Sequence, residues 1–495
     1  MSQRRDVPGT TATAVAPPAA QTAADTGRGA DRASAGLRLG AIVAVCCVAQ
    51  FMIVLDSTIV TVALPAMRAG LHLSGQQQQW VVDGYLVALG GLLLLAARIG
   101  DLVGHRRVLR FGLVVFTLAS LIGGLTTSGA LLIAARAVQG VGAAALGPAS
   151  LSLIATTHTE PGRRTRALAL WSLMGGAAAA VGVVLGGILT AELDWRWVLF
   201  VNVPIGAVLF AAAGWALPRT GGHAARGSRI DLPGGLLATV AATSLTFGFS
   251  RAPVDGWTSA PVLGPLIAAP VLLAAFVLVE LRSAMPLVPP SFFRSRRLGV
   301  GNAVMFCLGA TMTSSLVLIT LYLQQCLGYS ALRSGLALVP MTIVLIVGTL
   351  LSRPLLPRVG PRALLVGGGL IAAGGVVWMA DLPTHSAYAL HLLGPSVVVA
   401  LGISSMLLST TIATTSGVEP QNAGSASGLM TTSRQLGGAL GLAVLTSIAD
   451  FAARSGRGGP LDAAVHGYRI AFLWSAGIML LAVLAALALP RETEH

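Results

Sequence analysis

Residues 98–107 read Arg-Ile-Gly-Asp-Leu-Val-Gly-His-Arg-Arg and separate two apolar runs, at about 80–99 and 108–127. Glycine permits a tight turn here, because it adopts backbone conformations that side chains exclude. A short polar turn between two runs that are each long enough to cross a membrane predicts a helical hairpin.

A second turn of the same kind occurs later in the chain. Residues 356–362 read Leu-Pro-Arg-Val-Gly-Pro-Arg, and a shift of 256 positions aligns Gly104 with Gly360 and Arg106 with Arg362. An internal repeat at equivalent places is typical of transporters built from two related helical bundles. Chance similarity between two short turns rich in glycine and arginine is the alternative interpretation.

The composition around this repeat is that of a membrane protein. Of the 495 residues, 55% are hydrophobic and only 10% are charged, whereas average soluble domains carry roughly 25% charge. A water-soluble fold with so few charges would expose large apolar patches. The composition therefore predicts a polytopic membrane protein and argues against a water-soluble enzyme.

Fourteen apolar runs divide the chain into groups of six, two and six. They lie at about 39–64, 80–99, 108–127, 130–154, 167–190, 197–217, 232–250, 261–281, 299–326, 335–352, 363–380, 388–412, 429–449 and 469–489. Because about 20 apolar residues cross a hydrocarbon core as a helix, the pattern predicts an all-α integral membrane fold. Two pseudo-symmetric six-helix bundles would flank two extra helices.

This pattern also sets the expected domain boundaries. The first 36 residues are rich in Ala, Thr, Pro, Gly and Arg without apolar periodicity, which is typical of a disordered tail. The expected divisions are a tail at 1–36, an N-terminal bundle at 37–218, a linker carrying two extra helices at 219–298, a C-terminal bundle at 299–490 and a tail at 491–495.

The arginines predict the orientation of the chain. The net charge is +14 and all 32 basic residues are arginine; with fourteen spans, 23 of them lie on the side of the tails and seven on the other side. Arg136 and Arg434 complete the set inside apolar runs. The positive-inside rule places both termini in the cytoplasm of a multi-pass protein of the cell (inner) membrane. It also accounts for the basic excess without nucleic-acid binding.

Six motifs, spaced along the chain, carry a family resemblance. They are Leu-Asp-Ser-Thr-Ile-Val-Thr-Val-Ala-Leu-Pro at 55–65, the turn at 98–107, Arg-Ala-Val-Gln-Gly-Val-Gly at 136–142, Trp-Arg-Trp-Val-Leu-Phe-Val-Asn-Val-Pro-Ile-Gly at 195–206, Leu-Tyr-Leu-Gln-Gln-Cys-Leu-Gly-Tyr-Ser at 321–330 and Arg-Gln-Leu-Gly-Gly at 434–438. Together they resemble the 14-helix drug:proton antiporters of the major facilitator superfamily over about residues 39–489.

The resemblance implies a transporter rather than an enzyme. The expected function is proton-coupled export of amphipathic drugs or antibiotics by alternating access, with protons as the coupling ion and no other cofactor or metal. The expected partners are small amphipathic compounds, including cationic ones, and membrane lipids, and we expect a monomer. A dedicated exporter of one metabolite, lipid or siderophore would share every motif, and a proton symporter is a further alternative.

Three charged residues inside the apolar runs are the expected proton-coupling site. Asp56 and Arg136 lie roughly 12 Å and 9 Å below the same, outer side of the membrane at 1.5 Å per residue of helix. An isolated charge at this depth costs about 2.5–3.5 kcal/mol, so partners or a watery cavity are expected. The resemblance implies that Asp56 exchanges protons beside Arg136, and a fixed ion pair is the alternative. Asp83 is a second proton site or a solvated carboxylate.

Other residues have expected roles in gating and in the substrate cavity. The turn formed by Arg98, Gly100, Asp101, Gly104, Arg106 and Arg107 is predicted to be a gate latch. In it, Asp101 would cap the next helix or pair with an arginine such as Arg166. Tyr85, Gln139, Gln324 and Gln325 are candidate cavity residues, although Tyr85 could instead pack and the amides could bond between helices.

The fifth apolar run departs from the family pattern. The family motif there reads Gly-Pro-x-x-Gly-Gly, whereas this chain has Gly182, Val183, Gly186 and Gly187. Without the proline this helix keeps its backbone hydrogen bond and is expected to bend less. The three glycines would still permit close helix packing.

Overall fold

The computed structural model describes residues 18–157, 160–217, 231–283, 286–288, 292, 295–383, 388–415, 418, 423–456 and 459–489. It contains fourteen helical spans that are long and apolar enough to cross a membrane, in agreement with the fourteen predicted runs. No strand occurs in these ranges. The protein is therefore an all-α, multi-pass membrane protein.

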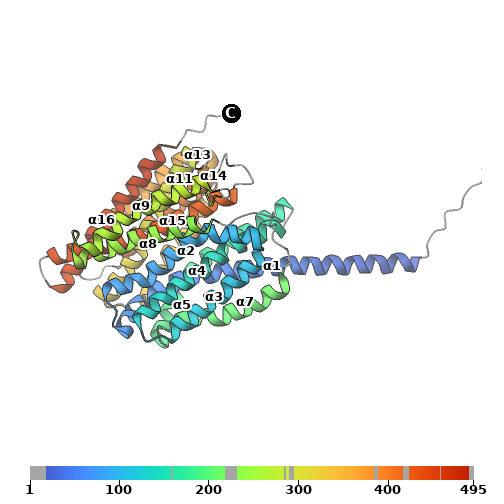
Figure 1. The fold of residues 1–495 in the computed structure, drawn as a ribbon, viewed down its shortest axis with the longest axis horizontal. Helices are drawn as coiled ribbons and strands as arrows, with labels where there is room; N and C mark the ends of the chain where they lie inside the picture. The colour runs from blue at the N-terminus through green and yellow to red at the C-terminus, as the bar shows by residue number, and fades with distance from the viewer. Residues whose placement is uncertain are drawn as a thin grey trace, which may run out of the picture.

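Two six-helix bundles form the body of the molecule (Figure 1). The N-terminal bundle contains α1 (Pro18–Leu71), α2 (Gly75–Val103), α3 (His105–Leu125), α4 (Gly129–Thr157), α5 (Pro161–Glu192), and the pair α6 (Trp197–Phe200) and α7 (Asn202–Ala216). The C-terminal bundle contains α11 (Arg296–Leu321) with the π-helical turn η1 (Tyr322–Cys326), α12 (Ala331–Ser352), α13 (Leu356–Met379), η2 (Ala389–Leu393) with α14 (Gly394–Thr415), α15 (Ala423–Ser455) and α16 (Pro460–Leu487). Each bundle has its own apolar core.

The internal repeat that the sequence predicted is present in the two turns. Gly104 and Gly360 both have positive φ, 99° and 78°, a region that glycine adopts without steric cost. Arg106 donates to the carbonyl of Gly214 over 2.7 Å, and Arg362 donates to that of Leu487 over 2.6 Å. Each arginine thus satisfies a free carbonyl in the last turn of the sixth span of its own bundle.

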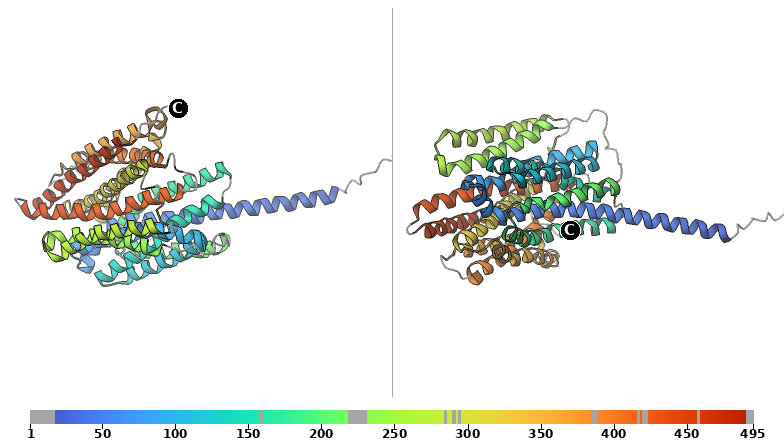
Figure 2. Two further views of the ribbon diagram at one scale, coloured as in Figure 1. Left: turned by 45° about the horizontal axis from the view of Figure 1, so that its top comes forward. Right: turned by 90° about the horizontal axis from the view of Figure 1, so that it is seen from below.

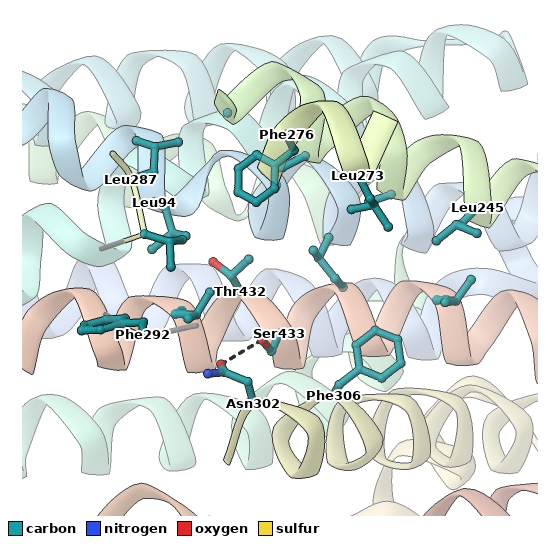
Figure 3. A pocket seen from close by; sticks show the side chains of 18 of the residues that line it. Leu94, Leu245, Leu273, Phe276, Leu287, Phe292, Asn302, Phe306, Thr432 and Ser433 are labelled. Carbon is teal, nitrogen blue, oxygen red and sulfur yellow. Dashed lines mark hydrogen bonds between the residues drawn. The ribbon is translucent and has the colours of Figure 1, made fainter. Parts of the chain in front are cut away.

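A helical hairpin between the bundles in sequence packs on their outer side. It consists of α8 (Leu232–Asp255) and α9 (Ala260–Arg282), and α8 contacts α2 of one bundle and α15 of the other (Figure 2). A cavity of about 440 Å³ lies between the hairpin, α2, α11 and α15 (Figure 3). The hairpin therefore covers the bundle interface from the side.

The first helix begins earlier than the sequence predicted. Residues 18–36 were expected to belong to a disordered tail, but α1 starts at Pro18 and projects beyond the bundles (Figure 1). Alanine is frequent in this stretch and has the highest helix propensity, which accounts for a helix without apolar periodicity. Residues 1–17 and the predicted tail at 491–495 lie outside the described residues.

The bundles contact one another on the side of the membrane away from the described chain ends, called here the far side. Gln324 donates to the carbonyl of Val62 over 2.9 Å, and Thr446 donates to Gln79 over 2.9 Å. Val62 and Val183 of the N-terminal bundle are fully buried in the apolar core of the C-terminal bundle. The far side is therefore closed in this structure.

Candidate functional site

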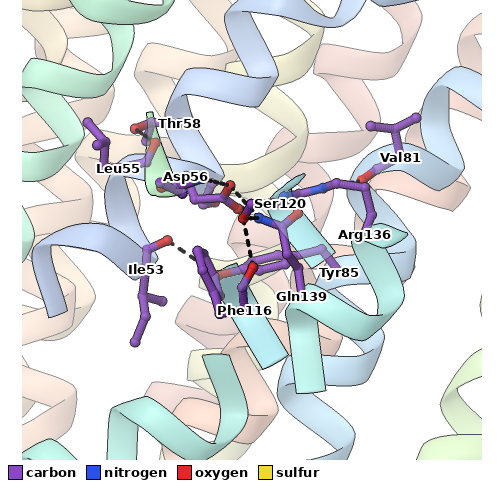
Figure 4. A network of polar contacts seen from close by, with 12 residues as sticks. Ile53, Leu55, Asp56, Thr58, Val81, Tyr85, Phe116, Ser120, Arg136 and Gln139 are labelled. Carbon is purple, nitrogen blue, oxygen red and sulfur yellow. Dashed lines mark hydrogen bonds and ion pairs between the residues drawn. The ribbon is translucent and has the colours of Figure 1, made fainter. Parts of the chain in front are cut away.

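A buried polar network at the centre of the N-terminal bundle contains Asp56 and Arg136 (Figure 4). Arg136 Nη1 lies 2.6 Å from Asp56 Oδ2, and the two side chains are 1% and 0% exposed. Gln139 and Asn202 each donate an amide N–H to Asp56 Oδ1, over 2.9 Å and 2.8 Å. The carboxylate on α1 is thus held by one cation and one amide from α4 and by a second amide from α7.

Arg136 is fixed by further contacts besides the carboxylate. Its Nε donates to the carbonyl of Val81 over 3.1 Å, and Nη1 also donates to Gln139 Oε1 over 2.8 Å. The guanidinium lies over the ring of Tyr85, 4.4 Å from its centroid, where a cation is attracted to the π face. Tyr85 itself donates to the carbonyl of Ile53 over 3.3 Å. The Asp56–Arg136 pair and its neighbours therefore link α1, α2 and α4.

Two members of this network were not selected from the sequence. Ser120 accepts from Gln139 over 2.6 Å and donates to the carbonyl of Phe116 over 2.8 Å. Asn202 begins α7, and its Oδ1 atom is buried without a hydrogen-bond partner. Both are polar residues inside apolar sequence, a signal that could have identified them. Asn202 also lies within a motif quoted for the family resemblance.

Asp83 occupies a second buried position, on α2. Its side chain is 0% exposed, so the prediction of a solvated carboxylate is wrong. Gln79 donates to Asp83 Oδ2 over 2.7 Å, while Oδ1 is buried without a partner. Because Gln79 also accepts from Thr446, a chain of two hydrogen bonds joins Asp83 to the C-terminal bundle.

The four candidate cavity residues do not lie around one cavity. Tyr85 and Gln139 are buried in the Asp56 network, and Gln324 bridges the two bundles. Gln325 accepts from Tyr468 over 3.3 Å and lines a pocket of about 100 Å³ on the far side. Hydrogen bonding between helices, the alternative interpretation of the amides, describes Gln139 and Gln324.

The predicted gate latch has different contacts from those expected. Asp101 lies 3.8 Å from Arg98 and 3.4 Å from His105, both near it in sequence, and these are its ion-pair partners in the described residues. The expected pairing with Arg166 is therefore absent there. The expected cap is also wrong, because Gly104 caps α3 without a side-chain hydrogen bond.

The remaining turn residues close the α2–α3 connection. Arg107 donates to the carbonyl of Val103 over 3.2 Å. A Cβ atom on Gly100 would come within 2.6 Å of the ring of His105. The turn therefore depends on a small residue at Gly100 and on the positive φ of Gly104.

The glycines of α5 allow two close helix contacts. A Cβ on Gly182 would clash with Thr58 of α1, and one on Gly186 would lie 2.9 Å from the Ile59 carbonyl. On the opposite side, a Cβ on Gly187 would lie 2.7 Å from Leu332 Cα of α12. Val183 is fully buried, and α5 is continuous from Pro161 to Glu192. These glycines therefore join α5 both to α1 and to the other bundle.

The described residues contain no group of three His, Cys, Asp or Glu side chains that could hold a metal ion. The arrangement instead offers two buried carboxylates, one paired with a cation and one without any cation. Such groups bind or release protons and respond to neighbouring charges.

Comparisons with known proteins agree with this picture. The chain is 45% identical to a cephamycin export protein of Amycolatopsis lactamdurans, over 90% of this chain and 92% of that protein. It is 39% identical to a puromycin resistance protein of Streptomyces alboniger, over 90% of each chain. A solved bacterial homologue of the human lysosomal transporter Spinster superposes with a TM-score of 0.62 at 17% identity, over 91% of this chain and 98% of that one. The family model described as Major Facilitator Superfamily matches residues 46–442, and the chain belongs to that family of membrane transporters.

Proposed function

We propose that the protein is a proton-coupled exporter of amphipathic antibiotics that works by alternating access. The observation that carries the proposal is the fully buried Asp56–Arg136 pair, at 2.6 Å, inside one of the two bundles. A buried ion pair stabilises a fold poorly in comparison with apolar packing. Its presence at this depth therefore favours a functional role over a brace between helices.

Protonation of Asp56 would change the balance of this network. The neutral carboxyl no longer offsets the Arg136 charge, and an uncompensated buried charge costs about 3–5 kcal/mol. Arg136 would then gain from a rearrangement that brings it water or another acceptor. Because its contacts fix α1, α2 and α4 relative to one another, such a rearrangement moves helices rather than one side chain.

Asp83 provides a second step that is coupled to closure of the far side. As a carboxylate it orients the Gln79 amide, whose oxygen then accepts from Thr446 across the bundle interface. A proton on Asp83 would turn an acceptor into a donor and remove the need for this amide orientation. Opening of the far side is thereby linked to the charge of Asp83.

The arginine distribution supports a cytoplasmic position for the ends of the chain, in the cell membrane. With that orientation the far side is external, and protons entering there would favour substrate release outside and return of the carrier. The membrane potential supplies about 2.3 kcal/mol per 100 mV for each charge that is moved. The transporter would work as a monomer with protons as its only coupling ion.

The names of the relatives support the class of substrate. The similar proteins are described by cephamycin export, puromycin resistance and, at 37% identity, lincomycin resistance in Streptomyces lincolnensis. Small amphipathic antibiotics, including cationic ones, are therefore the proposed cargo. Because each of these names refers to one compound, a dedicated exporter of a single metabolite is the second candidate, and a narrow resistance profile would favour it.

The test is a drug-panel resistance assay in a sensitive host, followed by efflux measurements on the compounds to which the protein confers resistance. The Asp56→Asn variant keeps the shape of the side chain and is expected to abolish resistance when it is compared with wild type at equal amounts of protein in the membrane. Asp462→Asn, which changes an exposed carboxyl in the first turn of α16 and outside the network, is the control and should retain resistance. Normal efflux in the Asp56→Asn variant would refute the proposal.

A further inference from the structure

A lateral cavity, separate from the Asp56 network, lies beneath the α8–α9 hairpin (Figure 3). Its volume of about 440 Å³ falls in the range of roughly 300–1,000 Å³ that is usual for small-molecule sites. Leu429 and Leu440 of α15 both line it, so it extends along that helix by about 16 Å at 1.5 Å per residue. It can therefore hold an elongated molecule of drug size.

The lining of this cavity disfavours charged ligands. Its walls carry leucine, valine, alanine, glycine and phenylalanine, and its polar side chains are the uncharged Asn302, Thr246, Thr432 and Ser433. Of its three aromatic residues, Phe276 and Phe306 come from α9 and α11, on opposite walls (Figure 3), and Phe292 comes from the linker before α11. A charged ligand would lose its hydration here without a counter-charge, which is costly. The occupant should be uncharged.

Among the polar side chains of the lining, the hydroxyl of Thr432 is buried without a partner. Thr432 is 8% exposed, its Oγ1 atom makes no hydrogen bond, and it points into the cavity (Figure 3). By contrast, its neighbour Ser433 donates to Asn302 Oδ1 over 2.9 Å. A buried hydroxyl without a partner costs about 1–3 kcal/mol, and an acceptor on a ligand would remove that cost. The occupant should therefore carry a carbonyl or ether oxygen.

The cavity is open towards the lipid rather than towards the centre of the protein. Leu273 of α9 lines it and yet is 42% exposed, and Gly299 of α11 on the other wall is also exposed. At one end, Glu280 accepts from the backbone N–H of Val288 over 3.2 Å and so fixes the linker that closes the cavity there. Access is therefore from the bilayer, between α9 and α11.

From these features we propose that the lateral cavity binds an uncharged amphipathic small molecule that arrives through the membrane and accepts a hydrogen bond from Thr432. Its walls come from α2 of one bundle and from α11 and α15 of the other. An occupant therefore contacts both bundles at once, and its affinity depends on their relative position. The idea that the occupant is a compound to be exported rests on the proposed function. The shape of the cavity and the chemistry of its lining do not depend on that proposal.

The test uses two fluorescent probes with protein in nanodiscs of phosphatidylethanolamine and phosphatidylglycerol, without a pH gradient. Nile red is uncharged and carries a carbonyl, whereas diphenylhexatriene is a hydrocarbon of elongated shape. Both are expected to show saturable binding, at one site per protein, above the signal of empty nanodiscs. The isosteric Thr432→Val should weaken Nile red binding about 2- to 10-fold and leave diphenylhexatriene binding unchanged.

A large side chain introduced into the cavity provides the second part of the binding test. Ala242 lines the cavity on α8, so Ala242→Trp should abolish binding of both probes. Val240 is 49% exposed on the same helix, so Val240→Trp is the matched control and should bind normally. Both measurements report binding without transport or a pH gradient, so a failure of the proton-coupling proposal would leave their outcome unchanged.

Three results would overturn the inference. The first is the absence of saturable binding above empty nanodiscs, and the second is equal binding by wild type and the Ala242→Trp variant. The third is a phospholipid that copurifies at one per wild-type protein and is absent from Ala242→Trp, because the cavity would then belong to a lipid.

Discussion

The two bundles share a scaffold but differ in where they bury charge. Both turn at a glycine of positive φ, and in both an arginine binds a carbonyl of the last helix, at 2.7 Å and 2.6 Å. Only the N-terminal bundle contains fully buried charges, at Asp56, Asp83 and Arg136; in the described part of the C-terminal bundle no Asp, Glu or Arg is buried to this extent. The repeated elements build the fold, and the elements that are not repeated carry the chemistry.

Hydrogen bonds between helices occur in both bundles, but those of the C-terminal bundle, such as Ser352–Ser405 and Ser433–Asn302, join uncharged side chains, whereas Asp56 accepts as the partner of a cation. In α11, Ser314 and Thr320 are 0% exposed and donate to carbonyls of their own helix. In the N-terminal bundle, Asp56, Gln139 and Asn202 join different helices. A local hydrogen bond moves with its helix, whereas a network between helices must break or rearrange when they shift. The N-terminal bundle is therefore the half in which a proton can be linked to helix movement.

The largest expected effect is on the free energy of unfolding. It distinguishes Arg136, which belongs to the buried pair, from Arg434, an arginine of the other bundle without an ion pair in the described residues. Arg136→Ala should lower the free energy of unfolding by about 3–5 kcal/mol, since it leaves Asp56 buried without a cation. Arg434 is half-buried and has no ion pair among the described residues, so Arg434→Ala should cost less than about 1 kcal/mol. Unfolding of the purified variants in detergent measures both, and equal losses would contradict the comparison.

A smaller effect tests whether the two turns are equivalent. Gly104→Ala and Gly360→Ala should each cost about 1–2 kcal/mol, because a side chain is strained at positive φ. Gly147 and Gly367 lie inside helices with open space around the position of a Cβ atom. Their alanine variants should be neutral or slightly stabilising. A large loss of unfolding free energy in only one of the two variants would show that the two turns are not structurally equivalent.

The smallest effect concerns the two arginines that follow these turns. Arg106→Ala and Arg362→Ala should each lower the free energy of unfolding by about 0.5–1.5 kcal/mol, the net contribution of a hydrogen bond. Arg107 donates within its own turn, to Val103, and Arg107→Ala is the control with no expected change. The melting temperatures of the three variants, compared side by side, provide the measurement. A shift for Arg107→Ala as large as for Arg106→Ala would contradict the capping role.

Much of the fold could be predicted because its signals are local in sequence. Each apolar run and each Gly–Arg turn is a short stretch of sequence, and the fourteen spans and the repeat followed from them. The arginine asymmetry is a count over the short loops between these runs. Asn202 could not be selected in this way, since its partner Asp56 is 146 positions away. The partners of Gln324 and the cavity beneath the hairpin depend likewise on how distant helices pack. The extent of α1 was missed because helix propensity, rather than apolar periodicity, determines it.

The central claim is that Asp56 exchanges a proton for substrate, and proton flux in proteoliposomes tests it most directly. The liposomes contain a pH-sensitive dye, and an antibiotic identified by the resistance assay is supplied on one side only. Substrate flow through the wild type should drive protons in the opposite direction, with none moved by the Asp56→Asn variant. Substrate movement without proton movement in the wild type, or an undiminished proton flux in Asp56→Asn, would contradict the claim.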